Sequence, residues 1–257
     1  TDSTLDNAKE RPRYGMVHPT GWIRNGEHIG RADTMSGEFV SSEAVTWLDN
    51  KKDDKPFFLY VAFTEVHTPL ASPKKYLDMY SQYMSAYEKQ HPDLFYGDWA
   101  DKPWRGAGEY YANISYMDEQ VGKVMDKIKS MGQEDNTIVI FTSDNGPAPS
   151  FKAVRSAYLR GTKNSLYEGG IRMPFIVKYP KKIKPGRVNN SSVLCAVDLY
   201  PTLCSVAGIK TEKNYKGDGQ NYAKVLLGKS EAKRKTDLMW DFGRNKHFGF
   251  PGNPYDR

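Results

Sequence analysis

Residues 137–180 decide the fold that this sequence predicts, and they read TIVIFTSDNGPAPSFKAVRSAYLRGTKNSLYEGGIRMPFIVKYP. The first six, residues 137–142, are β-branched, aromatic or apolar and carry no charge, which is typical of a strand buried on both faces. Asp144 and Asn145 follow where this run stops. In open α/β sheets, ligands bind at the carboxyl ends of the strands. The stretch therefore predicts a central strand that delivers two polar side chains to a binding edge.

Asp144 and Asn145 allow two interpretations. A carboxylate and an amide carbonyl are hard oxygen donors, and these are the ligands that Ca²⁺ and Mg²⁺ prefer. The sequence Asp-Asn-Gly-Pro is also a turn signal, because all four residue types favour turns. Taken alone, the residues leave a metal site and an ordinary turn both open.

Lys163 is a second polar candidate in the same stretch. A single lysine is normally a solvated surface charge. This one lies between Gly161 and Gly169, whose backbones are permissive, and shortly before another apolar run at residues 175–178. That position makes Lys163 a candidate site residue.

His67 follows a second strongly apolar run. Residues 56–63 read PFFLYVAF and predict another central strand, and the sequence TEVHTPL comes directly after them. A lone histidine is most often structural or exposed, but here it is the titratable side chain at the end of a predicted strand. Thr68 precedes a proline and is therefore held extended.

These blocks together resemble the sulfatase family of the alkaline-phosphatase superfamily. The family pattern has an apolar strand that ends in Asp-Asn-Gly, then Gly-x-Lys four residues before an aromatic residue and Glu-Gly-Gly-(Ile/Val)-Arg-x-Pro. Lys163 stands four residues before Tyr167 and matches the family's sulfate-binding lysine. His67 matches the histidine of the family's Pro-Phe-Phe-Leu-Tyr…His-x-Pro segment. The resemblance extends over residues 36–209.

The resemblance implies an α/β fold with an alkaline-phosphatase-like central mixed sheet flanked by helices, here incomplete. It implies a sulfuric ester hydrolase, similar to arylsulfatases and N-acetylgalactosamine-6-sulfatases, that releases sulfate by a formylglycine mechanism. Asp144 and Asn145 would hold Ca²⁺ or Mg²⁺, Lys163 would bind the sulfate, and His67 would bind the ester oxygen and protonate the leaving alcohol. The family also implies a secreted, periplasmic or lysosomal location.

Two parts of the family pattern are missing near the N-terminus of this sequence. We expect the chain to lack the formylglycine precursor, a Cys or Ser in the pattern Cys/Ser-x-Pro/Ala-x-Arg, since neither Cys195 nor Cys204 begins such a pattern. The pair of metal-binding aspartates after an apolar run is also missing. We therefore expect the middle and later part of a sulfatase, inactive by itself.

Two other functions stay open at this point. A phosphonate monoester hydrolase or phosphodiesterase of the same superfamily would carry additional Asp and His metal ligands, but only His247 follows His91. A glycan-binding remnant without catalysis would keep the fold and lack the nucleophile. A Cys/Ser-x-Pro-x-Arg motif in the upstream coding sequence would favour the enzyme.

The composition limits the classes of molecule that the chain is expected to bind. The chain of 257 residues has a formal net charge of +6, which suits an acidic partner such as a sulfated glycan, a phosphate ester or nucleic acid. No zinc-finger spacing, RNA-recognition signature or Gly-rich phosphate loop supports nucleic acid. No run approaches the about 20 apolar residues of a membrane-spanning helix. The expected partner is a sulfated small molecule or glycan, and the oligomeric state stays open.

Hydrophobic spacing and capping residues predict the remaining elements. These are helices at 37–50, 109–131 and 198–208, a strand at 175–178 and a short strand at 192–196. The helix at 109–131 carries one apolar stripe, made of Ile114, Met117, Val121, Val124, Ile128 and Met131. Gly132 is its predicted C-cap, and Asp198 is the predicted N-cap of the last helix. Cys195 and Cys204 are predicted to be buried thiols, with a disulfide left open.

The predicted organisation is one incomplete sulfatase domain over residues 1–257. Residues 1–36 form an irregular approach segment, residues 37–209 the α/β core, and residues 210–257 the start of the C-terminal region. Residues 71–107 are rich in Tyr, Trp and Pro. They either line the substrate cleft, as the resemblance implies, or form a surface excursion.

Overall fold

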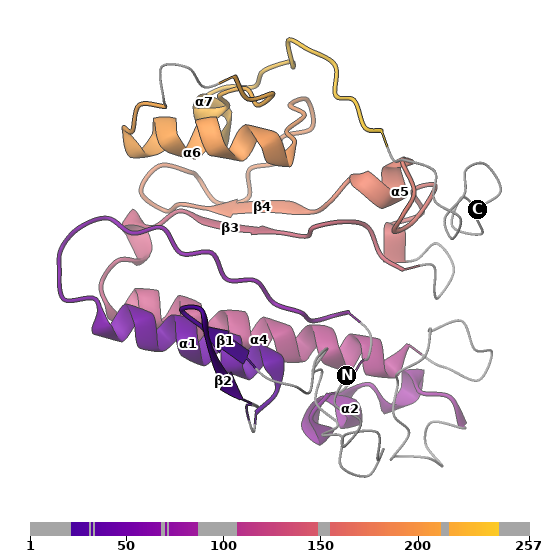
Figure 1. Cartoon of the computed structure of the whole chain (residues 1–257). Coiled ribbons are helices and arrows are strands. Elements are labelled where there is room, and N and C mark those ends of the chain that lie inside the picture. The colour runs from indigo at the N-terminus through magenta and orange to yellow at the C-terminus, as the bar shows by residue number, and fades with distance from the viewer. Residues whose placement is uncertain are drawn as a thin grey trace. The chain divides into compact units, whose positions relative to one another are not determined.

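The computed structural model describes residues 22–30, 32, 34–67, 70, 72–86, 107–148, 155–211 and 216–241. The chain divides into two compact units. The first unit comprises Thr1–Met131 with a short piece at 149–152, and the second comprises Gly132–Ala148 and Ala153–Arg257. Figure 1 shows the elements of both, and each unit is described by itself.

Two long helices, α1 (Ser36–Asn50) and α4 (Gly108–Ser130), pack against each other in the first unit (Figure 1). Their shared core is a cluster of buried apolar residues, namely Ala44, Leu48, Val124 and Ile128. The predicted helices at 37–50 and 109–131 are confirmed. Gly132 follows the C-cap of α4 with a φ of +68°, as expected for the left-handed residue that ends a helix.

The buried face of α4 is only partly the predicted apolar stripe. Val124 and Ile128 are buried, but Ile114, Met117 and Val121 are only partly so. Asn113 and Gln120 are almost fully buried instead, and Gln120 accepts a hydrogen bond of 2.9 Å from the Ser41 hydroxyl of α1. A spacing rule based on apolar residues misses such positions, because a polar side chain can be buried at little cost when it finds a partner.

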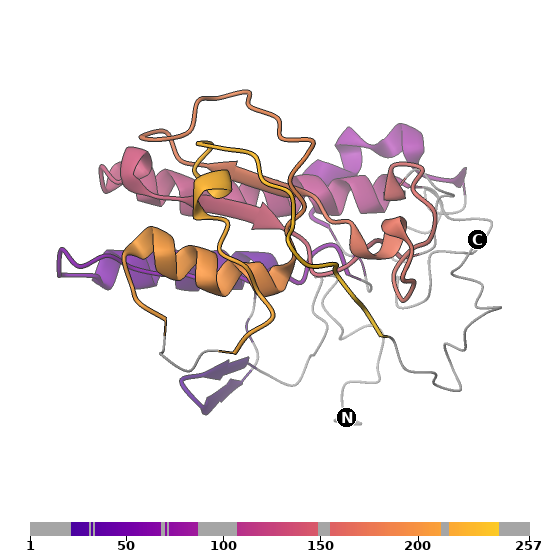
Figure 2. The same ribbon diagram turned by 90° about the horizontal axis from the view of Figure 1, so that it is seen from above.

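Strands β1 (Trp22–Arg24) and β2 (Glu27–Gly30) form an antiparallel hairpin (Figure 2). The prediction of an irregular segment is therefore wrong for these residues. Asn25 and Gly26 form the turn with φ angles of 52° and 87°. Positive φ at both central residues is the geometry of the tight hairpin turn that Asn-Gly favours. This dipeptide was the sequence signal for the hairpin.

Residues 56–63 are extended but are not a sheet strand, so the prediction of a central strand is wrong for the described part of the chain. No backbone hydrogen bond joins them to another described residue. Phe57, Leu59 and Val61 pack on the core between α1 and α4, whereas Phe58 and Tyr60 are 76% and 80% exposed. The segment thus has the alternating faces of a strand, with one face on the helices and the other uncovered.

Two further short elements complete the first unit. These are α2 (Lys74–Met79) and η2 (Ser81–Tyr83), a turn of 3₁₀ helix. Both pack on α4, where Tyr76 of α2 meets Tyr116 of α4 edge to face with ring centroids 5.9 Å apart. The predicted cleft segment at 71–107 falls mostly outside the described residues, because 87–106 are not among them.

The second unit contains an antiparallel pair of strands, β3 (Val139–Thr142) and β4 (Phe175–Lys178). In their register Val139 pairs with Lys178 and Thr142 with Phe175. The strand predicted at 175–178 is confirmed. The described residues contain only two two-stranded antiparallel sheets, so the predicted central mixed sheet does not appear among them. Because β3 has one neighbour, it is only half-buried to exposed rather than buried on both faces.

The helices of the second unit are η3 (Glu134–Asn136), α5 (Glu168–Ile171), η5 (Ala196–Asp198), α6 (Leu199–Ala207) and α7 (Ala223–Leu226). The helix predicted at 198–208 is confirmed, and Gly208 ends it with a φ of 72°. The short strand predicted at 192–196 is wrong, because this segment is irregular and runs into η5. Cys195 and Cys204 are free, half-buried thiols. Among the described residues, no helix is long and apolar enough to cross a bilayer.

Asp198 is the N-cap residue of α6, as predicted, but its side chain has a different role. Its buried carboxylate makes no capping bond to α6. It accepts hydrogen bonds from the backbone N–H groups of Cys195 (2.8 Å) and Gln220 (2.7 Å) and from the guanidinium of Arg234. The pKa of Arg234 is raised by its hydrogen bond to Asp198. Asp198 therefore anchors the segment after residue 216 to the start of α6.

Candidate functional site

The loop after β3 presents Asp144 and Asn145. The Oδ1 atom of Asp144 accepts a hydrogen bond from the backbone N–H of Asn145 (2.8 Å). The side-chain amide of Asn145 donates to the carbonyl oxygen of Gly146 (2.9 Å). Each side chain thus hydrogen-bonds the backbone of the next residue, and the chain bends at both positions. These bonds leave one oxygen of each side chain, Asp144 Oδ2 and Asn145 Oδ1, available to a ligand, so the metal interpretation and the turn interpretation both stay open.

Two backbone hydrogen bonds hold this loop against the loop that carries Lys163. The Gly146 N–H donates to the carbonyl oxygen of Gly170 (2.9 Å), and the Lys163 N–H donates to that of Pro147 (2.8 Å). Both views show α5, which follows the Lys163 loop, at the end of the strand pair where β3 stops (Figures 1 and 2). Asp144, Asn145 and Lys163 are therefore brought to the same end of the sheet.

Glycines make this close approach possible. A Cβ atom on Gly146 would lie 2.0 Å from the carbonyl oxygen of Gly169, and one on Gly169 would lie 2.0 Å from that of Gly161. A Cβ on Gly170 would lie 2.1 Å from the carbonyl oxygen of Ser165. No side chain fits at such distances. The glycines around Lys163 thus serve backbone contact between the two loops.

Cationic groups surround the Lys163 loop. Lys163 itself is half-buried. The Arg160 guanidinium lies over the Tyr167 ring, 3.8 Å from its centroid, which fixes this cation beside the loop. Arg172 pairs with Glu168 across one turn of α5 at 3.1 Å. The loop therefore carries cationic residues at the same end of the strand pair as two hard oxygen donors, and an anion bound together with a divalent cation would need both kinds of group.

Asp144 and Asn145 fit a hard cation in type but not in number. Ca²⁺ takes about six to eight oxygen ligands, and these two side chains offer one free oxygen each. The described residues contain no group of three or more His, Cys, Asp or Glu that could hold a metal ion. A bound Ca²⁺ or Mg²⁺ would therefore need further ligands besides Asp144 and Asn145.

His67 belongs to the first unit, whereas the other three predicted residues belong to the second. It ends a turn in which its N–H donates to the carbonyl oxygen of Thr64 (2.9 Å), and its side chain is exposed. The structure therefore brings together Asp144, Asn145 and Lys163, and it describes His67 in its own unit. That His67 joins the other three stays a prediction.

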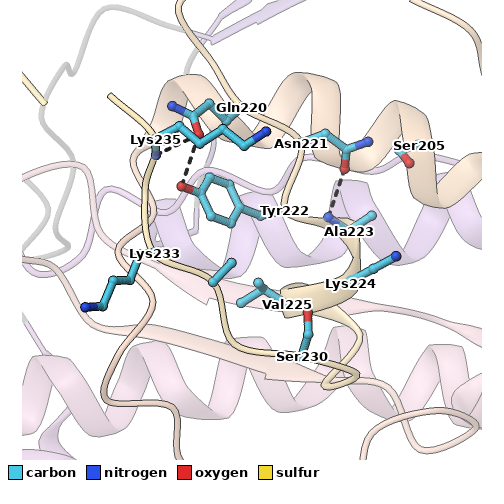
Figure 3. A pocket seen from close by; sticks show the side chains of 11 residues that line it. Ser205, Gln220, Asn221, Tyr222, Ala223, Lys224, Val225, Ser230, Lys233 and Lys235 are labelled. Atoms are coloured by element: carbon cyan, nitrogen blue, oxygen red, sulfur yellow. Dashed lines mark hydrogen bonds between the residues drawn. The ribbon is translucent and has the colours of Figure 1, made fainter. Parts of the chain in front are cut away.

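The sequence does contain one stretch with the letters of the formylglycine pattern, at Ser230-Glu231-Ala232-Lys233-Arg234. The expectation that no such pattern occurs in the chain is therefore wrong. Ser230 lines a cavity of about 320 Å³ between residues 220–225 and 230–235 (Figure 3). Arg234 binds the buried Asp198, so this arginine has a structural role. The stretch lies after α7 and not ahead of the other sulfatase blocks.

A protein-family comparison matches residues 2–209 to the family described as Sulfatase. A protein of Formosa agariphila described as "Sulfatase" is 34% identical over 205 residues, which cover 76% of this chain and 34% of that protein. The N-acetylgalactosamine-6-O-sulfatase of Bacteroides thetaiotaomicron is 28% identical over 226 residues, which cover 84% of this chain and 39% of that enzyme. The chain thus spans well under half the length of these relatives.

The chain is also similar to solved structures. The crystal structure of Ps i-CgsB in complex with k-i-k-neocarrahexaose has a TM-score of 0.66 and 28% identity to this chain. The match covers 82% of this chain and 42% of that one. The likeness supports the alkaline-phosphatase-like fold, although the described residues contain only small sheets. The chain belongs to the sulfatase family.

Proposed function

We propose that the full-length protein hydrolyses sulfate esters of a carbohydrate with the help of a divalent metal ion. The observation that carries this proposal is the pair of backbone hydrogen bonds from Gly146 and Lys163, which hold the Asp144–Asn145 loop against the Lys163 loop. A sulfate ester is an anion that gains charge on its leaving oxygen as it reacts. A site that joins a cation to hard oxygen donors matches that requirement.

The proposed substrate class follows from the relatives. One relative is named for the 6-O-sulfate of N-acetylgalactosamine, and one similar structure contains neocarrahexaose. The net charge of +6 suits a polyanionic glycan. We therefore place a sulfated carbohydrate before a simple aryl sulfate as the natural substrate.

In the proposed mechanism Asp144 and Asn145 would hold a divalent metal ion with their free oxygens, together with further ligands. Such an ion would supply positive charge to the sulfate oxygens and orient the attacking group. The Lys163 ammonium binds a sulfate oxygen and stabilises the charge that develops there. The glycine contacts around it keep that loop in place before the substrate arrives, so little reorganisation is needed.

His67 has the role of the general acid in this proposal. An imidazole can donate a proton near neutral pH, and the leaving alcohol needs one when its bond to sulfur breaks. His67 would bind the bridging ester oxygen and protonate it. This role requires the exposed side chain of His67 to face the Lys163 loop in the full-length protein.

Sulfate release by the full-length protein tests the proposal, with p-nitrophenyl sulfate and a 6-sulfated N-acetylgalactosamine as substrates in the presence of Ca²⁺. We expect Lys163→Ala to lower kcat/KM by about 10²–10³, a typical loss for one such electrostatic contact. Lys184→Ala, on an exposed loop after β4, is the matched control and should leave kcat/KM unchanged. Equal activity of the two variants would remove Lys163 from the mechanism.

Other substrates separate the remaining candidates. Turnover of phenyl phosphonate in place of the sulfate esters would assign the protein to the phosphoryl-transfer branch of the superfamily. The second candidate is a remnant without catalysis, because Arg234 of the Ser230 pattern is held by Asp198 in a structural role. Binding of a sulfated glycan without turnover by the full-length protein would support that candidate. We expect the 257-residue chain alone to release no sulfate, because a covalent mechanism needs its nucleophile.

A further inference from the structure

The first turn of α1 is capped by a residue from a distant part of the chain. The N-cap residue Met35 makes no side-chain hydrogen bond. The Gly37 N–H and the Ser36 hydroxyl instead both donate to Oε1 of Glu65, each at 2.8 Å. Glu65 lies 28 residues after Gly37. A carboxylate at a helix N-terminus is favourable, since it accepts from unpaired N–H groups and opposes the positive end of the helix dipole.

The same turn is tied to α1 by a second side chain. The Thr64 hydroxyl donates to the Ser36 hydroxyl oxygen (2.8 Å), and Ser36 is almost fully buried. The Thr64 carbonyl oxygen in turn accepts the N–H of His67 (2.9 Å). A continuous set of hydrogen bonds therefore runs from the start of α1, through Thr64 and Glu65, to the backbone of His67.

Gly37 gives the Glu65 carboxylate its space. A Cβ atom at position 37 would lie 2.9 Å from Oε1 and 3.0 Å from Cδ of Glu65. The crowded atoms are the end of a flexible side chain, so an alanine there would push the carboxylate away without blocking the helix. Position 37 thus offers a way to disturb the contact without changing Glu65.

Glu65 has no cationic partner among the described residues that would explain it as an ion pair, because none of their ion pairs includes it. A helix that needs only a cap normally takes it from its own N-cap residue, where Ser, Thr, Asp or Asn would serve. Here the cap comes from the residue two positions before His67. This placement couples the position of the His67 turn to the start of α1, which packs against α4.

We propose that Glu65 is a positioning residue for His67. By accepting from Ser36 and Gly37, its carboxylate fixes the 64–67 turn on α1, and the turn sets where the His67 imidazole stands. The expected effect on turnover rests on the proposed function. The expected effect on the position of the His67 ring does not, and it can be measured without turnover.

The test uses the full-length protein with ¹³C-labelled histidine rings, in which the His67 signal is identified by its loss in His67→Asn. The variants are Glu65→Ala, Glu65→Gln and Gly37→Ala, and the control is Glu43→Gln, which removes an exposed α1 carboxylate that pairs with Arg24. We expect the His67 ring signal to shift or broaden in Glu65→Ala and Gly37→Ala. In Glu65→Gln, which keeps a hydrogen-bond acceptor, the His67 signal should lie close to its wild-type position. In Glu43→Gln it should be unchanged.

Turnover is the second measurement. We expect kcat to fall by about 10²-fold in Glu65→Ala, the size of effect that a misplacement of about 1 Å can produce, with KM less affected and Glu65→Gln in between. An unchanged His67 ring signal in Gly37→Ala and in the folded Glu65 variants overturns the proposal. A ring signal that moves while kcat stays constant supports the positioning role and instead removes His67 from the proposed mechanism.

Discussion

Gly169 can be replaced by no other residue without moving backbone. Its Cβ position lies 2.0 Å from the carbonyl oxygen of Gly161 and 2.8 Å from that of Arg160, and backbone atoms cannot swing aside as a side chain can. We expect Gly169→Ala to lower the free energy of unfolding by about 1–3 kcal/mol, the usual cost of overpacking. Denaturant unfolding of the full-length protein measures it.

Gly122 is the matched control for Gly169. It lies inside α4, and a Cβ there meets no atom within 4 Å. Gly122→Ala should therefore raise the free energy of unfolding by about 0.5–1 kcal/mol, because alanine has less conformational freedom to lose in a helix. A destabilised Gly122→Ala or an unaffected Gly169→Ala would contradict the packing described around the Lys163 loop.

Asp198 and Arg234 form a buried ion pair, in which each charge is compensated by the other. The Asp198 side chain is fully buried and the Arg234 side chain is 9% exposed. Arg234→Met leaves an uncompensated buried carboxylate and should cost about 3–5 kcal/mol of unfolding free energy. The double variant Asp198→Leu/Arg234→Met should recover part of that loss, since no unpaired charge remains. A double variant that is less stable than Arg234→Met alone would argue against the pair.

The candidate residues differ in how far the sequence could predict them. Asp144 and Lys163 could be found from the sequence, because each lies in a short segment next to a strand. Each segment also contains glycines, which allow the backbones of the loops to approach closely. Glu65 could not be found, since its partners Ser36 and Gly37 are distant in sequence and the contact follows no periodicity. His67 could be named as a candidate, but it belongs to a different unit from the others, and no local pattern relates residues so distant in sequence.

One carboxylate of α4, that of Glu119, binds two residues of α2. Glu119 accepts hydrogen bonds from the Lys75 ammonium (2.6 Å) and from the Tyr76 hydroxyl. The hydrogen bond from Lys75 is the largest cause that lowers the pKa of Glu119. The pKa of Glu119 is lower in the folded state than in the unfolded state. The contact therefore stabilises the folded state fully at pH values above the unfolded-state pKa of Glu119. This stabilisation is lost as the pH falls through the folded-state pKa.

Removing Lys75 should raise the pKa of Glu119. We expect the carboxyl titration of Glu119, followed by NMR, to move back toward the ordinary range in Lys75→Ala. Lys74→Ala is the matched control: Lys74 pairs with Asp78 inside α2 at 2.6 Å, and its loss should leave the Glu119 titration in place. Equal titration curves in wild type and Lys75→Ala would show that the contact does not persist in solution.

The elements that could be predicted are those with local signals. α4 has a long apolar period and a glycine after its end, and α6 lies between its N-cap residue Asp198 and its C-cap residue Gly208. The strand expected at residues 56–63 has the right alternation of faces but no described partner. Pairing depends on distant chain, so a run of apolar residues indicates an extended segment and cannot by itself supply its neighbour.

The described part of the molecule carries large uncovered apolar side chains. Phe58 and Tyr60 are mostly exposed on the extended segment, and Ile176 on β4 is 60% exposed. Unpaired backbone next to such side chains is a template for association. We expect the 257-residue chain, taken alone, to self-associate as its concentration rises. Sedimentation equilibrium measures this, with Phe58→Ser/Tyr60→Ser expected to weaken it and a uniformly monomeric chain contradicting it.

The sequence predicted the family of the chain better than it predicted the sheet that the described residues form. Ordered blocks such as those around His67 and Lys163 identify the family, and the family comparison over residues 2–209 agrees with them. The mixed sheet does not appear among the described residues. A sheet is built from strands brought together across the whole chain, and this chain spans 34% of the length of its Formosa relative.

The hydrogen bond from the Gly146 amide to Gly170 also affects how the protein ages chemically. An asparagine followed by glycine tends to deamidate, because the glycine nitrogen attacks the side-chain carbonyl and closes a cyclic imide. In the folded loop that nitrogen is buried and donates to Gly170 at 2.9 Å, and the Asn145 amide donates to the Gly146 carbonyl oxygen. Folding therefore protects Asn145. A chain that deamidates while unfolded to isoaspartate gains a backbone carbon, and Gly146 can then no longer fit against Gly169.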